Sequence, residues 1–263
     1  MHKVILRLLY NGRFYYGFQR QPNVPTIEGE LERVLSEHQC LKNFRESLYA
    51  ASSRTDRGVH ALSQTISFYT NCSVKKILVS IEELEPEIHV WAYRFDDTGE
   101  FHPRYWALWR EYIYVSDKNY WETIESISKV PGILRRLIGC KDYSFLGLPR
   151  DAPTFHCIFN IRISKWNNKT IYHIIGSSFT RQMIRKIISI LERGSLDIFK
   201  KPIMPARPDR LLLLNVRYSI SFKMINPRKL LSIIEYHSRR EVVFEYLYRN
   251  LVSQNAYWYD AFV

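Results

Sequence analysis

The sequence predicts an α+β fold made of two similar halves, each with a mainly antiparallel sheet flanked by helices. Segments with alternating apolar residues, typical of strands, mix in both halves with segments whose apolar residues recur every three or four positions, typical of helices. Short turn-like links between neighbouring strands favour antiparallel pairing. The chain has 263 residues, 46% of them hydrophobic, so it can bury a large core. We divide the chain into a first half, residues 1–118, and a second half, residues 119–263.

The first half, residues 1–118, has three features that define its elements. Asn11-Gly12-Arg13 is typical of a turn, and Thr26 is a candidate N-cap residue for the first helix. A polar loop that contains glycine, Arg54–His60, separates two strand-like segments. The predicted elements are a strand over Val4–Tyr10, a helix from Ile27 to about Cys40, strands over Ser47–Ser53 and Ser63–Tyr69, a helix over Val74–Leu84, and strands over Glu87–Phe95 and Arg104–Val115.

The second half, residues 119–263, contains the clearest hairpin pattern. Asn167-Asn168-Lys169 is the expected tip between two alternating segments. Pro131-Gly132 should interrupt the first helix of this half. The predicted elements are a helix over Trp121–Ile138, a loop over Lys141–Pro153, strands over Thr154–Trp166 and Thr170–Gly176, a helix over Phe179–Leu191, a loop over Lys201–Asp209, a strand over Leu211–Ser219, and a helical tail from Pro227.

The charge balance is strongly basic. The chain has 38 Lys and Arg against 26 Asp and Glu, a net charge of +12. A globular protein of this charge often binds a polyanion, because each cation placed at a phosphate releases a condensed counterion. The alternative is a basic surface that serves solubility, and we favour nucleic acid over it.

The four cysteines are Cys40, Cys72, Cys140 and Cys157, and none forms a CxxC pair. This spacing argues against a zinc site and predicts buried or free thiols in a reducing compartment. The N-terminus has no long apolar segment of the secretory type, and no apolar run approaches the length of a membrane span. A cytoplasmic protein is therefore expected, or a nuclear one if the source is eukaryotic.

The loop Arg54–Ala61 carries the most informative chemistry. Two arginines, Arg54 and Arg57, bracket the carboxylate of Asp56, and a neighbouring cation favours its ionised form. Gly58 permits the positive φ of a sharp turn. Two readings of the residues stay open: a site for a phosphate or a base, and an ordinary surface turn with a local ion pair.

Several segments together resemble the tRNA pseudouridine synthase A family. They occur in family order from about Leu6 to Tyr218, and the resemblance leans toward archaeal or eukaryotic members. Arg210 departs from the family's usual glycine, and the tail beyond Phe222 has no counterpart in the pattern. The segments that carry the resemblance are Arg54–Ala61, Tyr16–Gln21 with Thr26-Ile27-Glu28, Phe101–Arg104, Arg110–Tyr114, Phe179–Arg185, and Pro205-Ala206 through Leu211.

The resemblance implies a reaction and three catalytic residues. The expected fold is that of the pseudouridine synthases, with the active-site cleft between the two halves. The expected reaction isomerises uridine to pseudouridine in tRNA, in the anticodon stem-loop, without a cofactor or a metal. Asp56 would be the catalytic carboxylate, Tyr112 would pack against the uracil and assist proton transfer, and Arg185 would pair with Asp56 and keep it ionised.

The resemblance also implies how RNA is bound and in what assembly. The protein is expected to be a homodimer that holds tRNA in a basic cleft. Two other functions stay open: a non-catalytic RNA-binding protein or tRNA chaperone on the same scaffold, and a pseudouridine synthase that acts on another RNA. The side chains expected to contact RNA are Arg20, Arg54, Arg57, Arg104 and Arg181, with Arg13, Tyr15 and Tyr16 as further candidates. His60 is interpreted as a structural loop residue, and His102 has no assigned role.

Overall fold

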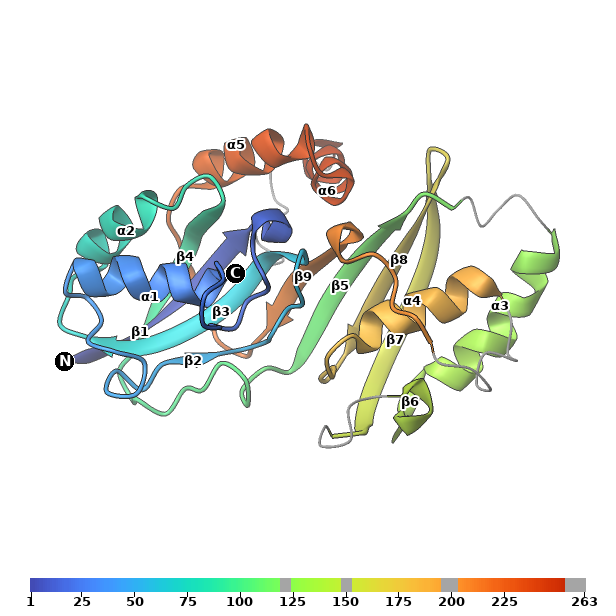
Figure 1. Cartoon of the computed structure of the whole chain (residues 1–263), viewed down its shortest axis with the longest axis horizontal. Coiled ribbons are helices and arrows are strands. Elements are labelled where there is room, and N and C mark those ends of the chain that lie inside the picture. Colours follow the sequence, from blue (N-terminus) through green and yellow to red (C-terminus); the bar gives the residue numbers. More distant parts are fainter. Residues whose placement is uncertain (119–123, 148–152, 195–202, 254–263) are drawn as a thin grey trace.

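The computed structural model describes residues 1–118, 124–147, 153–194 and 203–253 (Figure 1). Their centre is one ten-stranded sheet in the order β10-β4-β1-β3-β9-β5-β8-β7-β6, with β2 paired beside β3. The strands are β1 (His2–Tyr10), β2 (Ala50–Ala51), β3 (His60–Thr70), β4 (Ile88–Asp96), β5 (Trp109–Ser116), β6 (Gly139–Asp142), β7 (Phe155–Trp166), β8 (Lys169–Gly176), β9 (Leu211–Arg217) and β10 (Lys223–Met224). The predicted α+β class with mainly antiparallel pairing is confirmed.

The strands of the two halves join at the centre of the sheet. β3 pairs with β9 in parallel through His60 and Ala61, and β9 pairs with β5 in antiparallel fashion. All the other strand pairs are antiparallel. In place of two separate sheets, one sheet therefore continues through both halves, and β9 links them.

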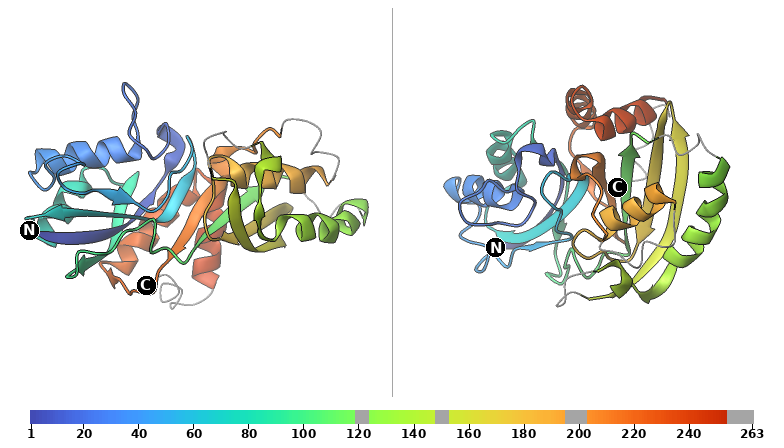
Figure 2. Two further views of the ribbon diagram at one scale, coloured as in Figure 1. Left: turned by 90° about the horizontal axis from the view of Figure 1, so that it is seen from below. Right: turned by 45° about the vertical axis from the view of Figure 1, so that its right-hand side comes forward.

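In the part of the chain that the structure describes, six α-helices lie on the sheet: α1 (Ile27–Glu37), α2 (Val74–Glu82), α3 (Ile124–Leu137), α4 (Met183–Arg193), α5 (Pro227–Ser238) and α6 (Val242–Ser253). The helices α1 and α2 cover one face of the strands of the first half, and α5 lies on the opposite face (Figure 2). The helices α3 and α4 cover the strands of the second half. The helix α1 buries Ile27, Leu31, Val34 and Leu35, and α4 buries Ile184, Ile187, Ile188 and Leu191, in each case the apolar side expected from the periodicity.

Several predicted element bounds are corrected by tertiary contacts. The expected strand Ser47–Ser53 is reduced to the two residues of β2, and β5 begins at Trp109 instead of Arg104. The helix α3 continues through Pro131, because Ile133 and Leu137 beyond it are fully buried and hold the last turns in place. The segment predicted as the loop Lys141–Pro153 begins with the strand β6 and a 3₁₀ turn at Ser144–Leu146.

The prediction of free thiols is wrong, because all four cysteines form disulfides. Cys40, just beyond α1, is bonded to Cys72, just beyond β3, and their Cα atoms are 5.3 Å apart. Cys140 and Cys157 are paired residues of the neighbouring strands β6 and β7. Spacing along the sequence could not reveal these pairs, since each is made by tertiary contact between separate elements.

Reduction of the Cys40–Cys72 bond should lower the free energy of unfolding by about 4 kcal/mol, because the bond closes a loop of 32 residues in the unfolded chain. Dithiothreitol also reduces Cys140–Cys157, so the contribution of Cys40–Cys72 is the loss that dithiothreitol causes in urea unfolding of the wild type minus the loss in a variant without this bond. The variant Cys40→Ala/Cys72→Ala is the control, and dithiothreitol should destabilise it less than the wild type. Equal urea midpoints for the wild type in both buffers, or titratable thiols in the unreduced denatured protein, would refute the prediction.

The segment from β10 to α6 packs against strands of the first half. The short strand β10 pairs with β4, α5 also contacts β4, and α6 contacts β5 (Figure 1). The predicted boundary at residue 118 falls directly after β5, and the division there stays a prediction. Within the described ranges, no helix is both long and apolar enough to span a bilayer.

Candidate active site

The loop that carries Asp56 connects β2 to β3 and lies against two other segments. The backbone N–H of Val59 donates to the Asp56 carbonyl over 3.1 Å and closes a tight turn, in which Gly58 adopts a φ of +79°. A Cβ atom added to Gly12 would lie 2.1 Å from the Val59 carbonyl oxygen, so only glycine allows this approach. The loop is thus held in one conformation.

The residue just before Asp56 is fixed from two sides. The hydroxyl of Thr55 shares a hydrogen bond of 2.8 Å with the buried hydroxyl of Tyr10, and the Thr55 carbonyl accepts from the backbone N–H of Phe18 over 3.1 Å. Tyr10 belongs to β1, which lies between β4 and β3 in the sheet, and Phe18 is fully buried. The Asp56 carboxylate is therefore placed by the core of the first half.

Asp56 forms an ion pair that crosses between the halves. Nη1 of Arg185, in the first turn of α4, donates to Oδ2 of Asp56 over 2.9 Å. Both side chains are largely buried, with 12% of Arg185 and 17% of Asp56 exposed. Nε of Arg185 also donates to the Ala206 carbonyl over 2.6 Å, which fixes the plane of the guanidinium. The predicted pairing of Arg185 with Asp56 is thus present in the structure.

Oδ1 of Asp56 has a more distant cationic neighbour than Oδ2. Its neighbour is Nε of Arg181, at 3.8 Å, and 77% of the Arg181 side chain is exposed. Arg181 and Arg185 are separated by one helical turn of sequence, although the helix itself begins only at Met183. The carboxylate therefore has one oxygen held by a largely buried cation and one whose nearest cation is exposed and more distant.

A small pocket surrounds this carboxylate. Its wall combines the loop that carries Asp56, one strand residue from each of β5 and β9, and the segment that leads into α4. It lies at the join of the two halves, where the cleft was expected. The lining residues are Arg54, Thr55, Asp56, Val59, Tyr112, Phe179, Thr180, Arg181, Gln182, Met183, Ile184, Arg185 and Leu211.

Tyr112 forms the apolar wall of the pocket. It lies on β5, it is 6% exposed, and its ring meets the edge of the Phe179 ring at a centroid distance of 5.5 Å. Burial raises the pKa of the Tyr112 hydroxyl to about 12, so the hydroxyl is protonated at neutral pH. The pocket thus offers a flat aromatic surface with a neutral hydroxyl beside a carboxylate.

Arg110, two residues before Tyr112, anchors the start of the loop that carries Asp56, and no role was predicted for it. Its buried guanidinium donates to the Ser52 carbonyl at 3.0 Å and to the Ser177 carbonyl at 2.5 Å. It also donates to the Ser53 hydroxyl at 3.2 Å and to the Arg104 carbonyl at 2.9 Å. An arginine inside an aromatic strand was the signal that could have pointed to such a buried network.

Two of the predicted RNA-contacting arginines line the pocket, and the other three do not. Arg54 and Arg181 line the pocket beside Asp56. Arg57 lies just outside it and stacks on the exposed ring of Tyr16 at 3.9 Å. Arg20 and Arg104 do not line the pocket, and Arg20 is bound to Glu32 at 2.5 Å.

Within the described ranges, no three or more His, Cys, Asp or Glu side chains are grouped so that they could hold a metal ion. Arg13, a further RNA candidate, is paired with Glu241 at 2.9 Å. The pocket therefore combines a carboxylate, three arginines (Arg54, Arg181 and Arg185) and an aromatic wall.

Known proteins resemble this chain over most of its length. The profile of a family described as tRNA pseudouridine synthase matches residues 133–237. Three relatives bear the name tRNA pseudouridine synthase A. That of Thermococcus gammatolerans is 30% identical over 84% of this chain and 87% of its own. That of Borrelia turicatae is 33% identical over 76% of this chain and 89% of its own. That of Pyrococcus furiosus is 28% identical over 94% of this chain and 98% of its own.

Proposed function

Because the chain belongs to the tRNA pseudouridine synthase A family, we propose that it isomerises uridine to pseudouridine in tRNA, with Asp56, Tyr112 and Arg185 as its catalytic residues. The observation that carries the assignment of residues is the ion pair of 2.9 Å between Asp56 and Arg185 in one pocket with Tyr112. The carboxylate of Asp56 therefore lies beside the ring of Tyr112, in the loop that resembles the family's aspartate motif.

The reaction breaks the bond from ribose C1′ to uracil N1 and forms a bond from C1′ to C5. N1 gains a proton and C5 loses one, so atoms and electrons balance without an oxidant or a leaving group. The enzyme must then hold the detached uracil while it turns. We assign the holding of the uracil to the ring of Tyr112, which is packed against Phe179. We assign the reaction with the target nucleotide to Oδ1 of Asp56.

The target uridine must leave its stack to reach this site. Asp56 is 17% exposed and Tyr112 6%, so a base inside a helical stem cannot contact them. Extrusion of a nucleotide costs a few kcal/mol, which contacts to the RNA must offset. Arg54 and Arg181 line the pocket and Arg57 lies next to it, and we propose that these three side chains bind the phosphates on either side of the uridine.

The test of the function is tritium release from a tRNA transcript labelled with C5-tritiated uridine. Pseudouridine formation frees the label into water, so release by the wild type is expected. No release, with tRNA still bound, would favour the two alternatives, a tRNA chaperone or an enzyme for another RNA. Transcripts of rRNA or small nuclear RNA tested in the same way separate these two.

Three finer points belong to the proposal. We propose that the uridines lie in the anticodon stem-loop, that the protein acts as a homodimer, and that it acts in the cytoplasm. Phe155 and Phe159 of β7 are 66% and 49% exposed, a typical feature of an interface. Light scattering tests the dimer, and transcripts with single uridines replaced test the position.

Replacing Tyr112 by phenylalanine should lower the rate of tritium release about 10²-fold, the usual effect of losing one proton-transfer group. The ring and its contact with Phe179 are retained, so tRNA affinity should not change. Single-turnover rates with excess enzyme, together with filter-binding affinity, measure both. A rate within threefold of the wild type would mean that Tyr112 contributes packing alone.

A further inference from the structure

His60 connects the catalytic loop to the C-terminal helices. It follows Val59 at the start of β3, and its ring is completely buried. The backbone N–H of Gly12 donates to Nδ1 over 3.2 Å, so Nε2 carries the proton and donates to the Asp209 carbonyl, also over 3.2 Å. Both ring nitrogens are therefore bonded to backbone from two separate segments.

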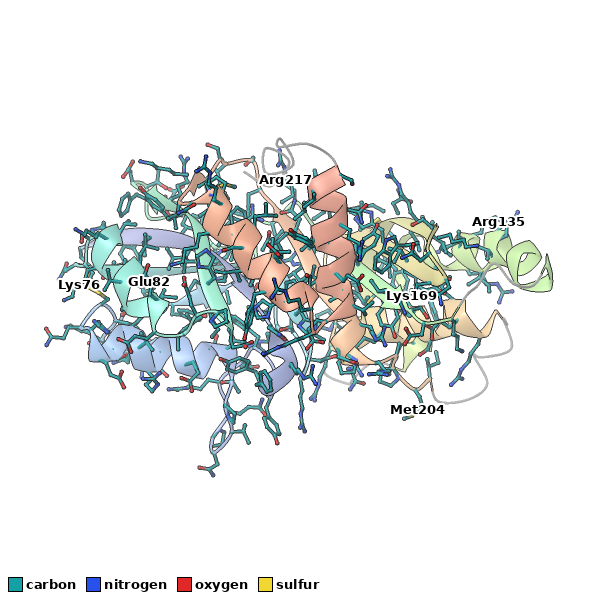
Figure 3. All side chains as sticks on the ribbon, turned by 90° about the horizontal axis from the view of Figure 1, so that it is seen from above. Lys76, Glu82, Arg135, Lys169, Met204 and Arg217 are labelled. Atoms are coloured by element: carbon teal, nitrogen blue, oxygen red, sulfur yellow. A yellow bond between two sulfur atoms is a disulfide. The ribbon has the colours of Figure 1, made fainter. Side chains whose placement is uncertain are left out.

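The C-terminal helices close the remaining sides of the ring. Phe244 of α6 meets the His60 ring edge-on at a centroid distance of 5.3 Å. Glu241, which precedes α6, places Oε2 4.0 Å from Nε2 of His60 and binds Arg13 with Oε1. Figure 3, seen from above, shows α5 and α6 running across the middle of the molecule, over the join of its halves.

The two helices are themselves held in place next to His60. His237 of α5 is fully buried, with Nδ1 accepting from the Asn11 side chain at 3.1 Å and Nε2 donating to the Pro86 carbonyl at 2.9 Å. Phe244 also packs against the His237 ring, at 5.1 Å. The pair of helices therefore forms a rigid support behind the loop, and Phe244 is its contact with His60.

A movement of His60 would be passed to Asp56. The carbonyl of the adjacent Val59 touches Gly12 so closely that no side chain fits there, and the Val59 N–H closes the turn on Asp56. Val59 also lines the pocket. A displacement of about 1 Å at a reacting group can lower the rate about 10²-fold. The contacts of His60 can therefore change the reaction rate through the position of Asp56.

We propose that His60 is a positioning residue, through which the hairpin of α5 and α6 holds the Asp56 loop in its reactive position. This rests on the proposed function, and it assigns a role to the C-terminal segment that the sequence left without one. The charged and titratable groups around the ring are Asp209, Glu241, Arg13 and His237. Burial lowers the pKa of His60 to about 4, so the neutral ring described above is the form present at neutral pH.

The test compares three variants with the wild type in single-turnover tritium release. His60→Leu removes both hydrogen bonds and should lower the rate about 10²-fold, with tRNA affinity unchanged. His60→Gln restores a donor toward Asp209 and should recover most of the rate. Phe244→Leu, a milder change in α6, should lower the rate about tenfold. His89→Leu is the matched control, because His89 is buried in β4 and bonds Glu85 instead of the loop.

Hydrogen exchange of the peptide covering residues 54–62 supplies a readout that does not need activity. It should quicken in His60→Leu and Phe244→Leu and stay unchanged in His89→Leu. Unchanged exchange in folded His60→Leu would overturn the inference, as would a rate within threefold of the wild type. Absence of tritium release by the wild type would instead refute the proposed function, and the exchange measurement would still decide the role of His60.

Discussion

Replacing Asp56 by asparagine will lower the rate of tritium release by at least about 10⁴-fold, a typical cost of removing an essential catalytic group. The amide has the size of the carboxylate, but it can neither attack carbon nor accept a proton. The buried guanidinium of Arg185 and the turn closed by Val59 do not depend on the negative charge for their backbone contacts, so the fold should be retained.

The affinity for tRNA provides the control for this variant. Loss of a negative charge beside Arg54 and Arg181 should leave binding unchanged or slightly tighter, since the phosphates then meet less repulsion. A variant that binds tRNA and releases no label supports the catalytic role. Release within tenfold of the wild type would show that another group performs the step, and that Asp56 serves the structure.

The chemistry of the site could be predicted because it depends on a short continuous segment. Five consecutive residues contain Asp56, the two arginines around it and Gly58, and this spacing alone predicts a tight charged loop. The pairing of Arg185 with Asp56 was expected from the family resemblance, and the structure contains it at 2.9 Å. The apolar side of α4 could be recognised from its periodicity, which orients Arg185 toward the loop.

The supports of the site could not be predicted, because they join segments that lie far apart in sequence. Arg110 reaches back to Ser52 and across to Ser177, and His60 meets Gly12, Asp209 and the last helices. The parallel pairing of β3 with β9, which merges the halves into one sheet, is likewise a contact between residues 60 and 212. Local periodicity reports the faces of an element, but not the partner that will cover them.

The two arginines beside Asp56 should differ sharply in their effects on catalysis. Arg185→Met removes the buried partner of the carboxylate and leaves a largely buried charge without compensation. We expect the rate of tritium release to fall about 10²-fold, with tRNA affinity changed by less than threefold, because this side chain is hardly accessible to RNA. Arg185→Lys should recover little of the rate, since lysine cannot bind both Asp56 and the Ala206 carbonyl with a planar fork.

Arg181→Met is the matched variant, with the same substitution beside the same carboxylate. Its guanidinium is exposed and approaches Oδ1 only to 3.8 Å, so its loss should hardly change the single-turnover rate at saturating enzyme. It should instead weaken tRNA binding and reduce the dependence of that binding on salt, as removal of one phosphate contact does. If both variants lost rate equally, the two arginines would share one role at the carboxylate. If Arg185→Met lost only affinity, the ion pair with Asp56 would have no part in the isomerisation.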